Sequence, residues 1–409
     1  MRKLFSFLFS AMLCLFIVTP SWCVDEVSIG LLYPLTGKMA PAGTDLVKGI
    51  ELATEIVNNA FPDLDLPLAG TAGLPNLGGA KLKLFVEDHE ASPEKAMSGA
   101  ERLINERKVS ALIGAHLSSC TATASQVAER YKVPMINAAS SSPTLTERGF
   151  KWFFRPSPHD ETFVESYFLF LNDVQKKTGK PIKRIALMCE DTLFGSDVVR
   201  LTHKFAEKHG YEIVLEILTT PGTNELTTEV QKIKAAKPDV LMTATYVSDQ
   251  ILYMRTAKEM DLNIDGLLMT TGWVDNSIIL PTLKEDGNHV ICRDVWALDL
   301  AAKKPLISKV NEMYKERHGV NMNGNIARAF QAAYVLYIAI NNAGSAEPAA
   351  IRDALASIDL DEKDLIVPWK RVKFNEQGQN EYGSSIIVQT LDNSFYTVWP
   401  FEYAAKELV

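Results

Sequence analysis

The chain has few cysteines, and they are widely spaced. Its 409 residues include 5 cysteines, and the last three of them, Cys120, Cys189 and Cys292, follow one another at long and uneven intervals. Such spacing matches neither a disulfide framework nor a metal site, and at most one bridge could form among the three. Because Cys189 and Cys292 lie in strand-like apolar runs, we expect buried free thiols.

The common catalytic and nucleotide-binding motifs are also missing. There is no G-x-x-x-x-G-K-[ST] loop, no G-x-S-x-G elbow and no H-E-x-x-H helix, and the 7 histidines lack ligand spacing. The cluster Asp88-His89-Glu90 could serve in acid–base or metal chemistry, although a solvated loop is the commoner outcome for such a cluster. The sequence therefore predicts no enzyme, no cofactor and no metal site. An exported hydrolase that uses these three residues remains as an alternative.

Only one long apolar run is present, and it is typical of a secretory signal peptide over residues 1–23. Arg2 and Lys3 precede a continuous apolar stretch from Leu4 to Val18, and Ser21-Trp22-Cys23 supplies small residues for cleavage. The stretch is short for a transmembrane span, and Trp22 disfavours lipidation of Cys23. A retained anchor and a lipoprotein are the alternatives to the exported, periplasmic protein that we expect.

The remaining chain is acidic and has a globular composition. Without the signal peptide it carries 40 basic and 50 acidic residues, a net charge of −10, which disfavours nucleic acid as a partner. Hydrophobic residues make up 47% and charged residues 22% of the sequence, and its length suffices for two domains.

Strand-like apolar runs alternate with helical segments twice along the chain. The predicted strands are 27–32, 81–87, 109–113 and 135–138 in the first half, and 184–189, 211–218, 240–244 and 266–269 in the second. This order predicts an α/β fold with two doubly wound, Rossmann-like units, each built on a parallel sheet. Residues 61–79, rich in Pro, Gly and Leu, are predicted to be a surface insertion, and 367–399 to form further strands.

A serine-rich loop, Gly114 to Thr121, connects the third predicted strand to a helix. Ser118 or Ser119 stands where the helix N-cap belongs. The first amides of a helix lack internal partners and carry the positive end of its dipole, so hydroxyls beside them can complete a site for a carboxylate. Simple capping of the helix is the alternative interpretation.

Other predicted strand-exit loops carry hydroxyls and aromatic rings. Ser140 and Ser141 follow the fourth strand, and Phe194, Tyr246 and Trp273 follow strands of the second unit. Ligands of open α/β sheets bind at the carboxyl ends of the strands. The sequence thus predicts a cleft for a small ligand with one polar end and a flat or apolar body. Ordinary core packing is the alternative for each ring.

Several of these segments together resemble the periplasmic binding proteins of branched-chain amino acid ABC transporters, the leucine/isoleucine/valine-binding type. The resemblance spans the mature chain apart from 61–79. The segments that carry it are Ile29 to Gly37, Gly114 to Thr121, Pro134 to Ser141, Phe153-Phe154-Arg155-Pro156, and Asp191-Thr192-Leu193-Phe194-Gly195.

The resemblance implies a two-lobed Venus-flytrap of the type I periplasmic binding fold, whose lobes are joined by three crossing segments and close on the ligand. We expect one lobe to comprise 24–157 and 295–383, and the other 158–294 and 384–409. The family's partners are the permease and ATPase subunits of an ABC importer, with no nucleic acid, and we expect a monomer.

The resemblance also implies roles for single residues. Ser118 matches the serine that holds the ligand carboxylate, and Thr121 lies in the same loop. Ala139, Ser140 and Ser141 match the loop that completes this clamp, and Phe194 and Tyr246 match two pocket tyrosines. With Ser119 and Trp273, these form the predicted ligand-binding set.

One family feature is missing from the sequence. The glutamate that pairs with an α-ammonium group should fall near Gly272, where the chain has Gly272-Trp273 and no acid before Asp275. A buried ammonium group needs a partner, so Asp275, Asp249 or another acid substitutes, or the ligand is not a simple α-amino acid. We expect a small carboxylate-bearing solute, either a branched-chain or aromatic amino acid or an aromatic acid. The alternative is a sensory ligand-binding subunit that binds amides, urea or another small polar ligand for a receptor.

Overall fold

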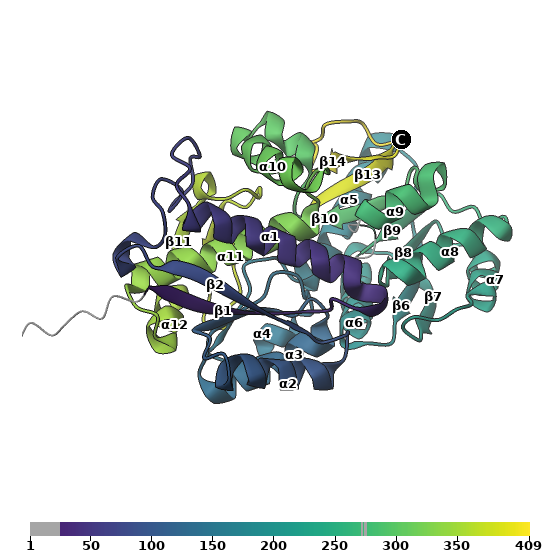
Figure 1. Ribbon diagram of the computed structural model, residues 1–409. Coiled ribbons are helices and arrows are strands. Elements are labelled where there is room, and N and C mark those ends of the chain that lie inside the picture. The colour runs from purple at the N-terminus through teal and green to yellow at the C-terminus, as the bar shows by residue number, and fades with distance from the viewer. Residues whose placement is uncertain (1–24, 271–272, 274–275) are drawn as a thin grey trace, which may run out of the picture.

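Two lobes lie side by side in the computed structural model (Figure 1), which describes residues 25–270, 273 and 276–409. Within these residues, lobe 1 is built on a five-stranded sheet in which every pairing is parallel. In spatial order its strands are β2 (Lys81–Asp88), β1 (Glu26–Tyr33), β3 (Ala111–Gly114), β4 (Met135–Ile136) and β5 (Phe153–Phe154).

Lobe 2 is built on a seven-stranded sheet in the described part of the chain. Its order is β14 (Ser394–Trp399), β13 (Ile386–Leu391), β10 (Ile291–Asp294), β9 (Gly266–Met269), β8 (Val240–Ala244), β6 (Arg184–Glu190) and β7 (Glu212–Thr219). The strands from β10 to β7 pair in parallel, and the late strands β13 and β14 extend the sheet in antiparallel fashion. The predicted doubly wound α/β architecture is therefore confirmed.

Helices cover both faces of each sheet, as parallel strands require. Lobe 1 has α2 and α3 on one face and α1 and α11 on the other, while α5 and α6 face α7, α8 and α9 across the sheet of lobe 2. Their bounds are α1 (Ala40–Asn58), α2 (Pro93–Asn105), α3 (Ser118–Tyr131), α5 (Asp160–Thr178), α6 (Leu193–His209), α7 (Thr227–Ala236), α8 (Val247–Glu259), α9 (Asn276–Leu283) and α11 (Gly324–Ala343). The remaining elements are the helices α4 (Thr144–Glu147), α10 (Pro305–His318) and α12 (Pro348–Ala356) and the hairpin strands β11 (Asp359–Asp361) and β12 (Arg371–Lys373).

The α1–α11 pair forms the centre of the largest apolar core. Almost every residue of α11 from Gly324 to Asn341 is buried, as expected for a helix that is apolar on all sides. The two backbones come unusually close at Gly49, where an added Cβ atom would lie 2.4 Å from the carbonyl oxygen of Ile326. None of the helices in the described residues is both long and apolar enough to cross a membrane.

Segments that connect the lobes run beside one another and bond through polar side chains. The backbone of Arg155, just after β5, pairs with Gly378 and Asn380, and Asn380 donates from Nδ2 to the carbonyl oxygen of Pro156 at 3.0 Å. Next to them, the guanidinium of Arg293 lies 3.8 Å from the Asp160 carboxylate and 3.7 Å from the centre of the Phe163 ring. The exact lobe boundaries at 157/158, 294/295 and 383/384 stay a prediction.

Two local expectations have clear outcomes. The three cysteines of the described chain are free and buried, as predicted, and burial raises the pKa values of Cys120 and Cys189 to about 12. Residues 61–79, predicted to be a surface insertion, include many exposed residues, but Leu64, Leu66, Leu74 and other apolar side chains of this segment belong to the main core. The segment therefore lies on the surface and is anchored to lobe 1 by these side chains.

Candidate functional site

The serine-rich loop after β3 places Ser118 at the first helical position of α3. The N-cap residue is Leu117, and no side chain caps this helix end, so the capping interpretation of the serines is wrong. Ser118 is buried, and its Oγ accepts a long hydrogen bond of 3.4 Å from the backbone N–H of Ser142. The hydroxyl therefore faces the neighbouring loop after β4, next to the positive end of the helix.

Two of the predicted hydroxyls hold these loops together. Thr121 Oγ1 accepts from the Ala115 backbone N–H at 3.0 Å and lies 2.6 Å from Ser140 Oγ. Ser140 Oγ in turn lies 2.7 Å from the His116 carbonyl oxygen, to which it can donate. Both side chains are buried, and neither lines the two cavities described next. They connect the two loops and do not form the wall of a cavity.

The lobes enclose a small space, here called the inner cavity, at the N-terminus of α3. Its volume of about 10 Å³ is at the lower limit for holding a single water molecule in this conformation. Lobe 1 contributes hydroxyls and the start of α11, and lobe 2 contributes two aromatic rings. The lining residues are His116, Ser118, Ala139, Ser141, Phe194, Tyr246, Asn325 and Arg328.

A larger space, here called the outer cavity, adjoins the inner one through shared walls. It has a volume of about 240 Å³, and both cavities are lined by Ser118, Phe194 and Tyr246. The two rings lie 5.7 Å apart between centroids at an interplanar angle of 40°. Ser119, Glu190, Lys38 and Ser248 are among the further residues that line the outer cavity. The structure thus brings six of the predicted site residues together: Ser118, Ser119, Ala139, Ser141, Phe194 and Tyr246.

Positive charge at the inner cavity comes from Arg328, which the sequence analysis missed. This buried guanidinium lies 3.6 Å from the Asp294 carboxylate and donates to the Gly324 carbonyl oxygen at 3.3 Å. Burial, with a smaller contribution from the charge of Arg328, lowers the pKa of His116 to about 3, so the imidazole is neutral at physiological pH. Hydroxyls, a helix N-terminus and a guanidinium around a small cavity make it suited to an anionic group.

The Glu190 side chain at the end of β6 is a second residue that the sequence analysis passed over. Its Oε1 accepts the backbone N–H of Tyr246 at 2.9 Å. Only 1% of the residue is exposed, and burial raises the pKa of its carboxyl to about 8, with a smaller contribution from the negative charge of Asp249. The carboxyl is therefore mostly protonated at neutral pH in this conformation.

We expect this carboxyl to make the unliganded protein less stable as the pH rises. In the unfolded chain Glu190 ionises near pH 4.5, whereas in the folded chain it does so near pH 8. Between these values the unfolded state binds fewer protons, so the wild-type free energy of unfolding should fall relative to that of Glu190→Gln, by up to about 1.4 kcal/mol per pH unit. Urea denaturation of both proteins from pH 5 to 9 measures this difference. Stability curves that stay parallel over that range would contradict the expected shift.

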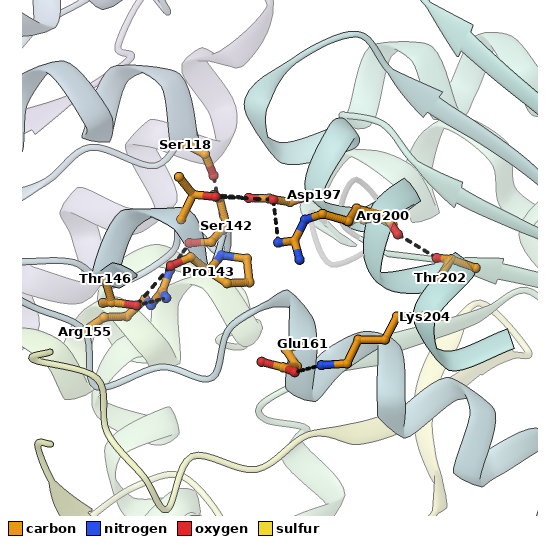
Figure 2. Close-up of polar contacts among 12 residues, drawn as sticks. Ser118, Ser142, Pro143, Thr146, Arg155, Glu161, Asp197, Arg200, Thr202 and Lys204 are labelled. Carbon is orange, nitrogen blue, oxygen red and sulfur yellow. Dashed lines mark hydrogen bonds and ion pairs between the residues drawn. The ribbon is translucent and has the colours of Figure 1, made fainter. Parts of the chain in front are cut away.

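A hydrogen-bonded cluster joins the lobes beside the inner cavity (Figure 2). Asp197 of α6 accepts from Ser142 Oγ and, at 3.0 Å, from Thr144 Oγ1 of lobe 1. Arg200, on the same helix as Asp197, donates to its other oxygen at 2.8 Å. We call Ser142, Thr144 and Asp197 the latch. Since Ser142 also donates its backbone N–H to Ser118, the latch is directly connected to the cavity wall.

A further contact between the lobes lies at the rim of the outer cavity. There Lys38 Nζ donates to the Gly222 carbonyl oxygen at 3.1 Å. Together with the latch, it shows that the lobes touch on two sides of the cavities in this conformation.

Trp273 is not brought to either cavity. Its side chain is fully buried in the core of lobe 2, where Nε1 donates to Thr390 Oγ1 at 2.7 Å and the ring packs on Gly287. Of the acids considered as ammonium partners, Asp275 lies outside the described residues, as does Gly272. Asp249 lines neither cavity, and its Oδ2 accepts the Gly222 backbone N–H at 3.0 Å.

The charged cluster after β2 has a structural place. Asp88 accepts from the Leu35 backbone N–H at 2.8 Å and from Thr36 Oγ1 at 2.7 Å, while Glu90 pairs with Lys95. His89 is fully buried, with Nε2 2.9 Å from the Ala115 carbonyl oxygen. Within the described residues no group of three or more His, Cys, Asp or Glu could hold a metal ion. The hydrogen bonds and the ion pair of these three residues thus give them a role in holding the loop.

Comparison with known proteins agrees with the two-lobed geometry. The model of the periplasmic binding protein family matches residues 26–389. A Leu/Ile/Val-binding protein homolog of Brucella suis is 26% identical over 392 residues, which cover 94% of both chains. A leucine-binding protein of Thermotoga maritima superposes with a TM-score of 0.77 at 21% identity, covering 91% of this chain and 97% of that one.

Two further solved structures were determined with ligands. One is a branched-chain amino acid substrate-binding protein of Streptococcus pneumoniae in complex with isoleucine, with a TM-score of 0.75, 18% identity and coverage of 90% and 97%. The other is a solute-binding protein of R. palustris in complex with benzoate, with a TM-score of 0.76, 16% identity and coverage of 91% and 95%. These likenesses support the same fold for this chain.

Proposed function

Because this chain belongs to the periplasmic binding protein family, whose members are non-enzymatic solute-binding components of transport systems, we propose that it captures a small carboxylate-bearing solute for an ABC importer. The observation that carries this proposal is the inner cavity, where Ser118, Ser141 and the N-terminus of α3 surround a space beside the Arg328 guanidinium. An anionic group gains charge-assisted hydrogen bonds there, and the helix dipole adds to them.

Each predicted site residue except Trp273 has a role in this proposal. Ser118, Ser141 and the backbone at Ala139 hold the carboxylate, and Phe194 and Tyr246 contact the body of the solute in the outer cavity. Ser119 contacts the solute at the outer cavity. Thr121 and Ser140 bond to each other and so hold the loop after β3 against the loop after β4. Branched-chain or aromatic amino acids and aromatic acids are the candidate solutes, and the related structures with isoleucine and with benzoate support both classes.

Lobe closure supplies the transport signal in this proposal. A solute that contacts both lobes binds the closed state better than the open state and therefore raises the closed population. The closed form then docks on the membrane permease, which works with ATPase subunits. We place the protein outside the cytoplasm, in the periplasm, after removal of the signal peptide 1–23, and expect a monomer.

The first test is the effect of Ser118→Ala on solute affinity. Thermal-shift screening of amino acids, aromatic acids and small amides identifies a solute, because a ligand that binds only the folded state raises the melting temperature. Calorimetry should then show an affinity at least about tenfold lower for Ser118→Ala, which corresponds to one lost charge-assisted hydrogen bond.

A matched control is Ser98→Ala on α2, whose hydroxyl donates to the carbonyl oxygens of Glu94 and Lys95 in its own helix and, within the described residues, lines neither cavity. This variant should bind like the wild type. Unchanged affinity in Ser118→Ala, or a screen in which no carboxylate raises the melting temperature, would refute the proposed function.

A further inference from the structure

One carboxyl oxygen in the cleft has no use in the carboxylate-binding role. Glu190 holds the backbone of Tyr246 with Oε1, while its Oε2 is buried and lacks a hydrogen-bond partner among the described residues. Leaving such a polar atom unpaired inside a protein is costly, and buried side-chain oxygens nearly always have a partner. An unpaired carboxyl oxygen in a cavity wall therefore indicates a missing hydrogen-bond partner.

Glu190 lies apart from the residues that hold the carboxylate, so its missing partner belongs to another part of the solute. Glu190 lines the outer cavity and not the inner one, whereas Ala139 and Ser141 line the inner cavity and not the outer one. Phe194 and Tyr246 border both spaces. In this conformation the inner cavity holds no more than a water-sized group, so we place the body of a bound solute in the outer cavity, where Glu190 contacts the body rather than the carboxylate end.

The surroundings of Glu190 favour a cationic donor. The charge that raises its pKa beyond the effect of burial is the negative Asp249, whose Oδ2 accepts the Gly222 backbone N–H. Lys38, the cation that lines the same cavity, is bonded to the Gly222 carbonyl oxygen at the rim. A protonated amine of the solute would supply the positive charge that a buried carboxylate requires.

We propose that Glu190 binds a protonated amine carried on the body of the solute, remote from its carboxylate. This inference rests on the proposed function and narrows it to amino acids whose amine is not in the α position. The carboxylate of the solute enters the inner cavity, the two rings flank its middle, and the ammonium group donates to Glu190 Oε2. Glu190 thereby takes over part of the role that an acid near Gly272 would have for an α-amino acid.

Three probe compounds of similar size test the position of the amine. They are para-(aminomethyl)benzoate, its isomer phenylglycine with the amine in the α position, and para-methylbenzoate without an amine. By calorimetry the wild type should bind para-(aminomethyl)benzoate at least about tenfold more tightly than either other compound. In Glu190→Gln this preference should disappear, while the affinity for para-methylbenzoate stays within about threefold of the wild type. Glutamine can still accept the Tyr246 N–H.

The wild type offers a second readout that does not depend on a variant. Since the pKa of Glu190 is raised to about 8 without ligand, an ammonium group that binds it should drive off its proton. Calorimetry at about pH 7 in two buffers of different ionisation enthalpy should show release of about one proton with para-(aminomethyl)benzoate and none with para-methylbenzoate.

Several results would overturn the inference. They are equal binding of the amine-bearing and amine-free compounds, a preference for phenylglycine, a preference that survives in Glu190→Gln, and failure of all three compounds to bind. If para-methylbenzoate still binds and its affinity still falls in Ser118→Ala, only the role of Glu190 is lost and the proposed function stands. If no carboxylate binds at all, both are lost.

Discussion

Replacing Arg155 with methionine is expected to lower the free energy of unfolding by about 3–5 kcal/mol, the largest stability change that we predict for a single side chain. The guanidinium is fully buried and donates to Gln379 Oε1 at 2.6 Å, to the carbonyl oxygens of Ser140 and Ser142 at 3.1 and 2.7 Å, and to Thr146 Oγ1 at 3.1 Å. Methionine fills much of the volume but leaves these four acceptors without their donor. Urea denaturation with a spectroscopic probe measures the loss.

The same substitution should reach the binding site, because Arg155 holds the loop that carries Ser141 (Figure 2). The folded fraction of Arg155→Met should therefore bind the solute less tightly than the wild type does. Arg130→Met is a matched control, since Arg130 is largely exposed and pairs with Glu101 on the surface of lobe 1. That change should cost less than about 1 kcal/mol. If Arg155→Met were as stable as Arg130→Met, the structural role of the buried guanidinium would be wrong.

Removing the latch acceptor with Asp197→Ala is expected to weaken solute binding roughly 30-fold or more, with little change in the cavity wall itself. Asp197 accepts two hydroxyl hydrogen bonds from the opposite lobe, from Ser142 and Thr144. These bonds exist only when the lobes touch, so their loss lowers the closed population, and the apparent affinity falls in proportion. Calorimetry gives the affinity, and small-angle X-ray scattering should show a more open unliganded protein.

Arg200→Met separates this effect from a general disturbance of α6. Arg200 also bonds to Asp197, but from the same helix, so its removal leaves the hydrogen bonds of Ser142 and Thr144 to Asp197 in place. We expect an affinity within about threefold of the wild type for this variant. An Asp197→Ala protein that binds as tightly as Arg200→Met would show that the latch contributes nothing to closure.

The parts of this fold that local patterns encode could be predicted from the sequence. The strands of both sheets stand out as short apolar runs, and the residues after them had to lie near the carboxyl edge of a sheet, where ligands bind. For this reason Ser118, Ser141, Phe194 and Tyr246 could be predicted from their positions, whereas Ala139 followed from the family resemblance, and all five line the cavities.

The parts that depend on contacts between distant segments could not be predicted. Arg328 lies on α11, an apolar helix whose sequence gives no sign that one turn near its start reaches the cavity. Trp273 was expected at the site because it follows a strand, but a loop aromatic ring can turn into the core as readily as into a cleft. Glu190 directly precedes the segment 191–195 that carries part of the family resemblance, yet its buried place depends on a distant segment, since it accepts the backbone N–H of Tyr246.

The buried state of the cysteines makes this protein easy to turn into an optical sensor. Maleimide dyes react with thiolates. Cys120, Cys189 and Cys292 are buried, and the pKa values of Cys120 and Cys189 are raised to about 12, so these thiols react poorly at neutral pH. A thiol introduced at the rim, for example by Lys38→Cys, would be the preferred point of attachment. Since Lys38 faces Gly222 of the other lobe, a dye there would sense each approach of the rims as a change in brightness.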